Sequence, residues 1–314
     1  MGEDLRAYVI EHLGDPAAVL VIDETGDVKK GTHTVGVQRQ YTGTAGRIEN
    51  SQVAVYLTYA ARRGHALLDR ELYLPRSWTD DPGRCAAAGV PAGVGFATKP
   101  ALARLMLARA LDAGVPAGWV AGDEVYGADP DLRAELEARR VGYVLAIAGN
   151  RRLPTAAGPL RADALAATVP RRAWQRLSAG PGAKGQRYYD WAWLELPAPA
   201  PSGADAAGAG CWWLLIRRSR RTGELAFYRC YHPTPVRLIQ LVAIAGRRWT
   251  VEECFQRAKE LGLDHCDARS WHGWHRHMSL CMAAAALLAK LAADLRRAAS
   301  GKRNETSPAE PAAA

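Results

Sequence analysis

The chain has 314 residues, of which 48% are hydrophobic and 23% charged, so global disorder is excluded and one large domain, or a core with an insertion, is within reach. The formal net charge of +9 suits a polyanionic partner but assigns none by itself. The cysteines are scattered without a CxxC pair, the N-terminus lacks a signal-peptide pattern, and the longest apolar stretch, 278–291, is too short to span a bilayer. We therefore expect a cytoplasmic protein with reduced thiols and no membrane contact.

The first half of the chain predicts an α/β layout. Residues 18–23 (AVLVID) form a short β-branched run that is typical of a strand buried on both faces. A meander of antiparallel strands is predicted from three segments linked through glycines: 32–43, 52–60 and 65–75. The elements expected next are a helix at 98–113, a strand at 119–123, a helix at about 129–140 and a strand at 143–149. This order indicates a mixed sheet covered by helices.

The alternation stops after residue 149. Residues 150–235 are rich in Pro, Gly and Ala and contain a run rich in Trp and Tyr. RYYDWAWLEL and CWWLLIRRS within them are strand-like, with PAPAPSGADAAGAG as the loop between them. We interpret 150–235 as a β-rich insertion between the first part of a core (1–149) and a helical last part (236–299). The polar, Pro/Ala-rich tail 300–314 is predicted to be disordered.

Two aspartates and one glutamate are the candidate chemical groups. Asp23 ends the first buried strand and Asp123 ends the later one, at the edge where sheet enzymes place their sites, although each aspartate alone is equally typical of a turn or helix cap. Arg248, Glu252 and Lys259 follow with helical spacing, so they share one stripe of a helix. An exposed i,i+4 ion pair between Arg248 and Glu252 is the plainer alternative.

The segments VIDETGDVKKG, VAGDEVYG and RRWTVEECFQRAK together resemble the DDE transposases of bacterial insertion sequences. The last segment is similar to their signature of an Arg, three residues, a Glu, six residues and a Lys, which falls on Arg248, Glu252 and Lys259. The stretches VGVQRQYTG, ELYLPRSWTDD and RSWHGWHRHMSL resemble in particular the insertion sequence 701 group, and the resemblance covers roughly residues 5–297. It departs from the family pattern at Glu24, where relatives often have a second Asp, and at Ala245, where many have a Tyr.

The resemblance implies an RNase H-like α/β fold, a mixed sheet flanked by helices, with the β-rich insertion between the second Asp and the catalytic Glu. It also implies that Asp23, Asp123 and Glu252 are catalytic and bind two Mg²⁺ (or Mn²⁺) ions. Cleavage of a phosphodiester in line needs one ion to activate water or a 3′-OH and one to stabilise the leaving oxygen, about 3.5–4 Å apart, and hard oxygen ligands suit Mg²⁺. The implied activity is that of an endonuclease that cuts at transposon ends and transfers the 3′-OH into target DNA.

Double-stranded DNA, as transposon ends and as target, is the implied partner of a homo-oligomer that is associated with the nucleoid when it acts. Arg248 and Lys259 are the expected phosphate contacts. Lys29, Lys30 and Arg39 follow Asp23 closely and are candidates for contacts along the DNA backbone, with ordinary solvated surface as the alternative. No nucleotide cofactor is expected, because the glycine-rich AGPGAKGQ lacks the ending of a P-loop.

Three alternatives remain open. The first is a truncated or inactive remnant that binds DNA without turnover, since only about twenty residues precede Asp23 whereas relatives carry a sizeable helical region there. The second is an α/β hydrolase that uses paired carboxylates on another substrate, such as a glycosidase. The third concerns the insertion, whose tryptophans are mostly expected to form its core but could include one that stacks on a DNA base.

Overall fold

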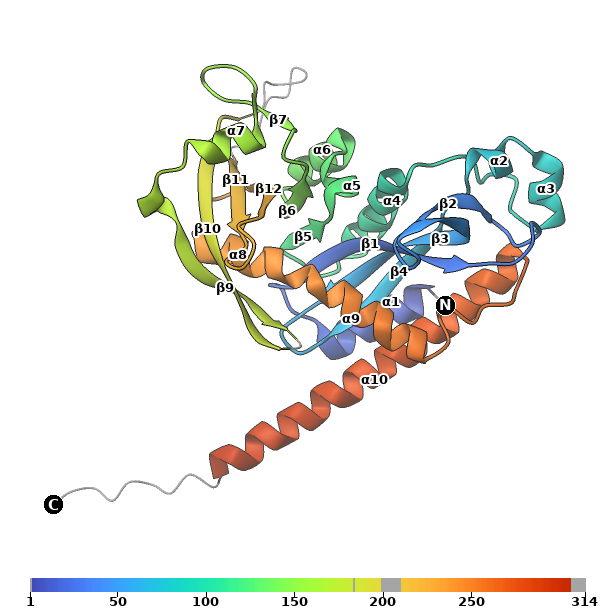
Figure 1. The fold of residues 1–314 in the computed structure, drawn as a ribbon. Coiled ribbons are helices and arrows are strands. Elements are labelled where there is room, and N and C mark those ends of the chain that lie inside the picture. Colours follow the sequence, from blue (N-terminus) through green and yellow to red (C-terminus); the bar gives the residue numbers. More distant parts are fainter. Residues whose placement is uncertain (1, 183, 199–209, 306–314) are drawn as a thin grey trace.

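The computed structural model describes residues 2–182, 184–198 and 210–305, and one ten-stranded sheet runs through them. The strand order is β2-β3-β1-β5-β6-β12-β11-β10-β9, and β4 pairs with β3 beside this path. Helices cover the sheet, and the long C-terminal helix α10 runs diagonally across the molecule (Figure 1). This arrangement confirms the predicted mixed sheet flanked by helices.

The N-terminal half forms one side of the sheet, from the edge strand β2 to β6. β1 pairs antiparallel with β3, and β3 pairs antiparallel with both β2 and β4, which is the predicted meander. The bounds are β1 (Val19–Val28), β2 (Gln38–Thr42), β3 (Arg47–Ala60) and β4 (His65–Leu72). The first residues of β1, from Val19 to Ile22, are almost completely buried because sheet and helices cover them on both sides.

Two parallel strands lie on the other side of β1. β5 (Trp119–Gly122) pairs with β1, and β6 (Gly142–Ile147) pairs with β5, both in parallel. Parallel strands need crossover connections, and helices supply them. The helices of this half are α1 (Gly2–Leu13), α2 (Arg76–Thr79), α3 (Pro82–Ala87), α4 (Lys99–Asp112), α5 (Glu124–Gly127) and α6 (Pro130–Ala138). α4 starts as the sequence predicts, since the Thr98 hydroxyl caps it by accepting a hydrogen bond from the Ala101 N–H at 3.2 Å.

The segment after β6 adds four strands to the same sheet instead of forming a sheet of its own, because β12 pairs antiparallel with β6. Its main elements are β9 (Gln175–Gly182), β10 (Gly185–Leu196), β11 (Cys211–Arg218) and β12 (Leu225–His232). A short hairpin, one small helix and one 3₁₀ turn precede them: β7 (Arg152–Leu153), β8 (Leu160–Arg161), α7 (Ala162–Ala167) and η1 (Arg171–Ala173). Trp191, Trp212 and Trp213 are buried in this part of the core. Most of the loop predicted between β10 and β11 lies outside the described residues.

Helices complete the chain. They are α8 (Leu238–Arg247), α9 (Trp249–Glu260) and α10 (Trp271–Glu305). α10 continues to Glu305, so it enters the tail 300–314 that was predicted to be disordered, and residues 306–314 lie outside the described part. Within the described residues, the stretch Trp271–Ala299 of α10 is long and apolar enough to cross a membrane, which corrects the expectation from sequence that no apolar segment has that length. Length and composition do not separate a membrane helix from a core helix, and 44% of its most apolar window is buried inside the molecule.

Candidate active site

Asp23 and Asp123 lie side by side at the sheet. Asp123 directly follows β5, but Asp23 lies inside β1, which continues to Val28 through its pairing with β3, and this corrects the expectation that Asp23 ends its strand. Ile22 of β1 and Gly122 of β5 are partners in the parallel register, so the residue that follows each of them lies at the same level on neighbouring strands. β5 ends at this point because the Asp123 carboxylate caps α5, accepting a hydrogen bond from the Val125 N–H at 2.9 Å. The carboxyl end of parallel strands is where α/β proteins commonly place their sites.

Glu252 reaches the same place through Arg248. Arg248 is the residue between α8 and α9, and its helical backbone angles (φ −53°, ψ −34°) carry the chain from one helix into the next. Its guanidinium bridges two carboxylates, with Nη1 3.2 Å from Asp23 Oδ2 and Nη2 3.1 Å from Glu252 Oε1. The i,i+4 ion pair considered from sequence is therefore present, and it extends to an aspartate that is distant in sequence.

Burial makes it unfavourable for Asp23 and Asp123 to carry their negative charges. The Asp23 side chain is only 16% exposed, whereas that of Glu252 is 40% exposed. Burial and, second, the charge of Asp123 raise the pKa of Asp23 to about 7, although Arg248 works in the opposite direction. Burial and the charge of Glu24 also raise the pKa of Asp123. Two carboxyl groups that resist carrying their negative charges together form a place that a cation stabilises.

The donor chemistry of Asp23 and Asp123 fits a hard divalent cation, since both are carboxylates and both carry an unfavourable charge. The third ligand is not gathered with them. Among the described residues, no group of three or more His, Cys, Asp or Glu side chains is arranged to hold a metal ion. Glu252 is instead paired with Arg248.

Glu24, Lys99 and Tyr126 adjoin the aspartates, and sequence reasoning did not assign a role to Lys99 or Tyr126. Glu24 accepts a hydrogen bond from Lys99 Nζ at 2.7 Å on one oxygen and from the Tyr126 hydroxyl on the other. Tyr126 is fully buried. The signal was present in the segment VAGDEVYG, which places Tyr126 one helical turn after Asp123. These partners fix the fourth carboxylate next to the site and offset its charge.

The lysines and arginine considered for DNA contacts lie in different surroundings. The Lys29 ammonium contacts the Asp27 carboxylate and donates to the Cys266 carbonyl at 2.6 Å, and its side chain is only 12% exposed. Lys259 lines a small cavity together with Asp27, away from the residues that line the cavity beside Arg248. Lys30 and Arg39 are exposed. Of the predicted phosphate contacts, only Arg248 is thus in contact with Asp23 and Glu252.

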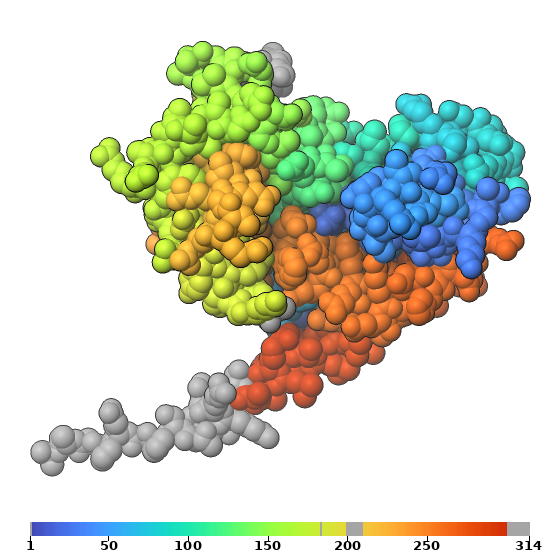
Figure 2. All heavy atoms as spheres, viewed as in Figure 1, coloured from blue at the N-terminus to red at the C-terminus, as the bar shows by residue number. Residues whose placement is uncertain are grey.

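A cavity of about 460 Å³ opens beside Arg248. It lies between the β10–β12 part of the sheet and the α8–α9 junction, and Figure 2 shows the surface hollowed between these two parts of the molecule. The lining is basic and aromatic: Lys184, Arg187, Arg217, Arg248, Tyr189, Tyr228 and Trp249. Ala245, one of the two departures from the family pattern, also lines it, so the space that a tyrosine side chain would fill is open here.

Two family models and one relative match this chain. A family model described as a DDE superfamily endonuclease matches residues 1–191, and one described as a transposase DDE domain matches residues 98–288. The first match includes Asp23 and Asp123, and the second includes Asp123 and Glu252. A relative named "Probable transposase for insertion sequence element IS701", from Microchaete diplosiphon, is 31% identical over 144 residues, which are 45% of this chain and 35% of that protein. The match therefore spans about a third of the length of this relative.

Proposed function

The chain belongs to the DDE superfamily endonucleases, and on this premise we propose that it is the catalytic part of a DNA transposase. Its activity is metal-dependent cleavage of double-stranded DNA at transposon ends, followed by transfer of the 3′-OH into target DNA. The observation that carries the proposal is that Arg248 contacts both Asp23 and Glu252, while Asp123 directly follows β5, the parallel neighbour of β1 at the level of Asp23.

Asp23, Asp123 and Glu252 are the residues proposed to hold two Mg²⁺ or Mn²⁺ ions. When bound, the ions supply activation of the attacking hydroxyl and stabilisation of the leaving oxygen. Arg248 is the cation of this chain that contacts the acidic group, so it is the residue proposed to contact the scissile phosphate through its planar guanidinium. Lys99 and Tyr126 hold Glu24 in place and thereby set the charge beside the aspartates.

A second candidate function, DNA binding without turnover, is favoured by one observation. Within the described residues the three acidic side chains are not arranged as a metal site, and Arg248 pairs with two of them. A protein with this arrangement fixed would bind DNA through its basic surfaces and leave it intact.

Nicking of supercoiled plasmid DNA in Mg²⁺ or Mn²⁺ separates the two functions. We expect nicking by the wild type and loss of nicking in Asp23→Asn, Asp123→Asn and Glu252→Gln. Glu260→Gln is the matched control, because Glu260 is an exposed glutamate on the same helix as Glu252. Equal nicking in wild type and all three site variants would reject the site. DNA binding by a wild type that does not nick would establish the second function.

A further inference from the structure

A second cavity, of about 600 Å³, lies on the other face of the α8–α9 junction from Arg248. Arg247, Thr250 and Glu253 line it, and at 100° per residue they lie on the side of the helices opposite to Arg248 and Ala245, which line the cavity beside the acidic residues. The turn between β3 and β4, the β9–β10 hairpin and α10 complete its walls.

Arginines dominate this second cavity, which we call the arginine groove and define by five cations: Arg62, Arg63, Arg187, Arg247 and Arg296. Glu253 is the acidic residue among the lining side chains. A groove with this balance of charge attracts anions that carry several charges.

His65 also lines the groove, and its pKa responds to the positive charge of the arginines. Burial and then the charges of Arg257, Arg296 and Arg247 lower the pKa of His65 to about 4, although Glu253 Oε2 lies 3.4 Å from its Nε2. His65 is therefore neutral at pH 7, and the charge of the groove comes from guanidinium groups, which stay protonated at every physiological pH.

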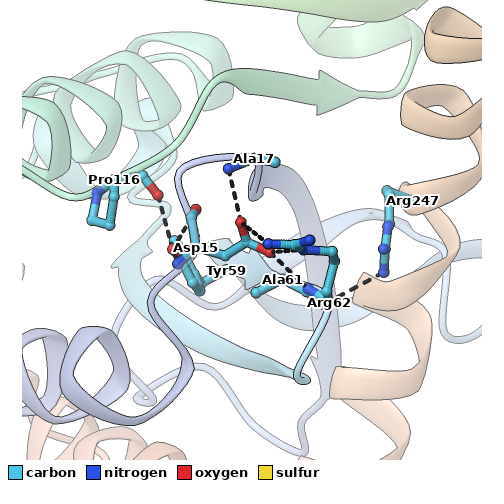
Figure 3. Close-up of polar contacts among 7 residues, drawn as sticks. All are labelled: Asp15, Ala17, Tyr59, Ala61, Arg62, Pro116 and Arg247. Carbon is cyan, nitrogen blue, oxygen red and sulfur yellow. Dashed lines mark hydrogen bonds and ion pairs between the residues drawn. The ribbon is translucent and has the colours of Figure 1, made fainter.

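Some of these arginines belong to the framework. Arg62 pairs with Asp15, whose side chain is 4% exposed, with Nε 2.8 Å from Oδ2 (Figure 3). Arg187 donates to the carbonyl oxygens of Ala179 and Gly246, at 2.7 and 2.9 Å, and so fastens the β9–β10 hairpin to the end of α8. Both guanidinium groups are held at the groove by contacts that the fold needs.

Two others are held only loosely. Arg247 donates to the Ala61 carbonyl at 3.5 Å, the limit of a hydrogen bond, as Figure 3 shows. Arg63 is 44% exposed and lies 4.0 Å from Asp294. These two guanidinium groups keep most of their donors for a ligand, because each guanidinium has five N–H groups.

We propose that the arginine groove binds the phosphate backbone of the same duplex DNA whose scissile phosphate lies at the acidic residues. The proposal rests on the proposed function for the identity of the ligand. The two cavities meet at Gln186, Arg187 and Trp249, which line both, so a backbone that leaves one passes directly to the other. Guanidinium groups match phosphate oxygens in pairs, and the groove contains no cluster of carboxylates, so its role is binding and not cleavage.

The test measures DNA affinity as a function of salt in the presence of EDTA, so that binding is read without cleavage. The probe is a labelled duplex of about 30 base pairs, followed by fluorescence anisotropy. Each phosphate contact contributes about 0.9 to the slope of log K against log [KCl], so Arg63→Gln/Arg247→Gln should reduce the slope by about 1.8. Arg171→Gln/Arg172→Gln is the matched control, since it removes the same charge from an exposed turn that lines neither cavity.

A variant that is expected to raise the DNA affinity shows that a reduced slope does not come from loss of folding. Glu253→Gln removes the negative charge of the groove and should raise the affinity for the duplex, which an unfolded protein cannot do. An unchanged slope in the arginine double variant, or an equal loss in the control pair, would overturn the groove. A loss confined to anionic phospholipid vesicles, with duplex binding intact, would overturn it in favour of a membrane.

The same experiment separates this inference from the proposed function. A wild type that nicks plasmid DNA while the double variant binds the duplex normally leaves the function standing and rejects the groove. A wild type that neither nicks nor binds duplex DNA rejects the function. A reduced slope together with nicking by the wild type supports both.

Discussion

Asp23, Asp123 and Glu252, which we call the acidic centre, and the arginine groove lie on opposite faces of the α8–α9 junction. Burial has opposite consequences in the two regions. At the acidic centre, burial raises the pKa of Asp23 to about 7, so the folded protein holds a carboxylate that it does not easily ionise. In the groove, the positive charge lies on arginines whose guanidinium groups donate to carbonyl oxygens or are partly exposed. Ionisation of the acidic centre is unfavourable without a bound cation, whereas the arginines of the groove stay protonated. A bound cation would therefore stabilise the proposed metal site, whereas the groove carries its charge without one.

The largest expected effect comes from Asp23→Asn. If the acidic centre is the metal site, nicking should fall by about three orders of magnitude, because metal stabilisation of the transition state contributes several kcal/mol. The folded pKa of Asp23 is raised, so the protonated carboxyl stabilises the wild type at low pH, and this contribution is lost as the pH rises from about 4 through 7. The melting temperature of the metal-free variant relative to the wild type should therefore be higher at pH 8 than at pH 5. Nicking at the wild-type rate would remove Asp23 from the site.

Gly246→Ala tests whether the β9–β10 hairpin couples the two regions. A Cβ at Gly246 collides with the Ala179 carbonyl oxygen, so the hairpin has to move away from the end of α8. We expect a loss of about 1–3 kcal/mol in the free energy of unfolding, measured by urea denaturation. Because Arg187 spans this contact, DNA affinity should fall as well. Gly93→Ala is the control, because a Cβ there meets open space, and full stability of Gly246→Ala would show that the hairpin does not depend on this contact.

The third prediction concerns pH. Metal needs ionised ligands, and a pKa of about 7 means that Asp23 is mostly protonated at pH 6. The affinity for Mn²⁺ should therefore fall by about tenfold per pH unit below 7 and level off above it. The increase in melting temperature with added Mn²⁺ at pH 6, 7 and 8 measures this dependence. An increase that is independent of pH would assign the ion to other ligands.

The part of the site that could be predicted from sequence is the part encoded locally. An aspartate directly follows the apolar first residues of β1 and the apolar strand β5, and Glu252 follows Arg248 by one helical turn. The link between Arg248 and Asp23 joins residues far apart in the chain, and so does the pairing of Glu24 with Lys99 and Tyr126. The same reason explains why the sequence predicts a β-rich insertion but does not reveal that β12 joins its strands to the core sheet through β6. Pairing between distant strands leaves no periodic trace in either one.

Tyr126→Phe gives a smaller effect, on the support of the acidic centre. It removes the hydroxyl that donates to Glu24 and leaves Lys99 as the remaining partner on the other oxygen. We expect a loss of about 1 kcal/mol in the free energy of unfolding and a modest fall in nicking, since the ring continues to fill its buried position. Tyr143→Phe is a matched control, because Tyr143 is also buried and donates to Glu137, away from the site. A larger fall in nicking for the control would show that Tyr126 acts only through stability.

The smallest expected effect on DNA binding is that of Lys30, which we compare with its neighbour Lys29. Lys30 is exposed, whereas Lys29 is held by Asp27 and the Cys266 carbonyl. If the DNA backbone passes this surface, Lys30→Gln should lower the slope of log K against log [KCl] by about 0.9, with no change in stability. Lys29→Gln should leave the slope unchanged and lower the melting temperature, because it breaks a partly buried ion pair. The reverse pattern would mean that Lys29 leaves Asp27 when DNA binds, and the arrangement of charges beside the acidic centre would then change with the substrate.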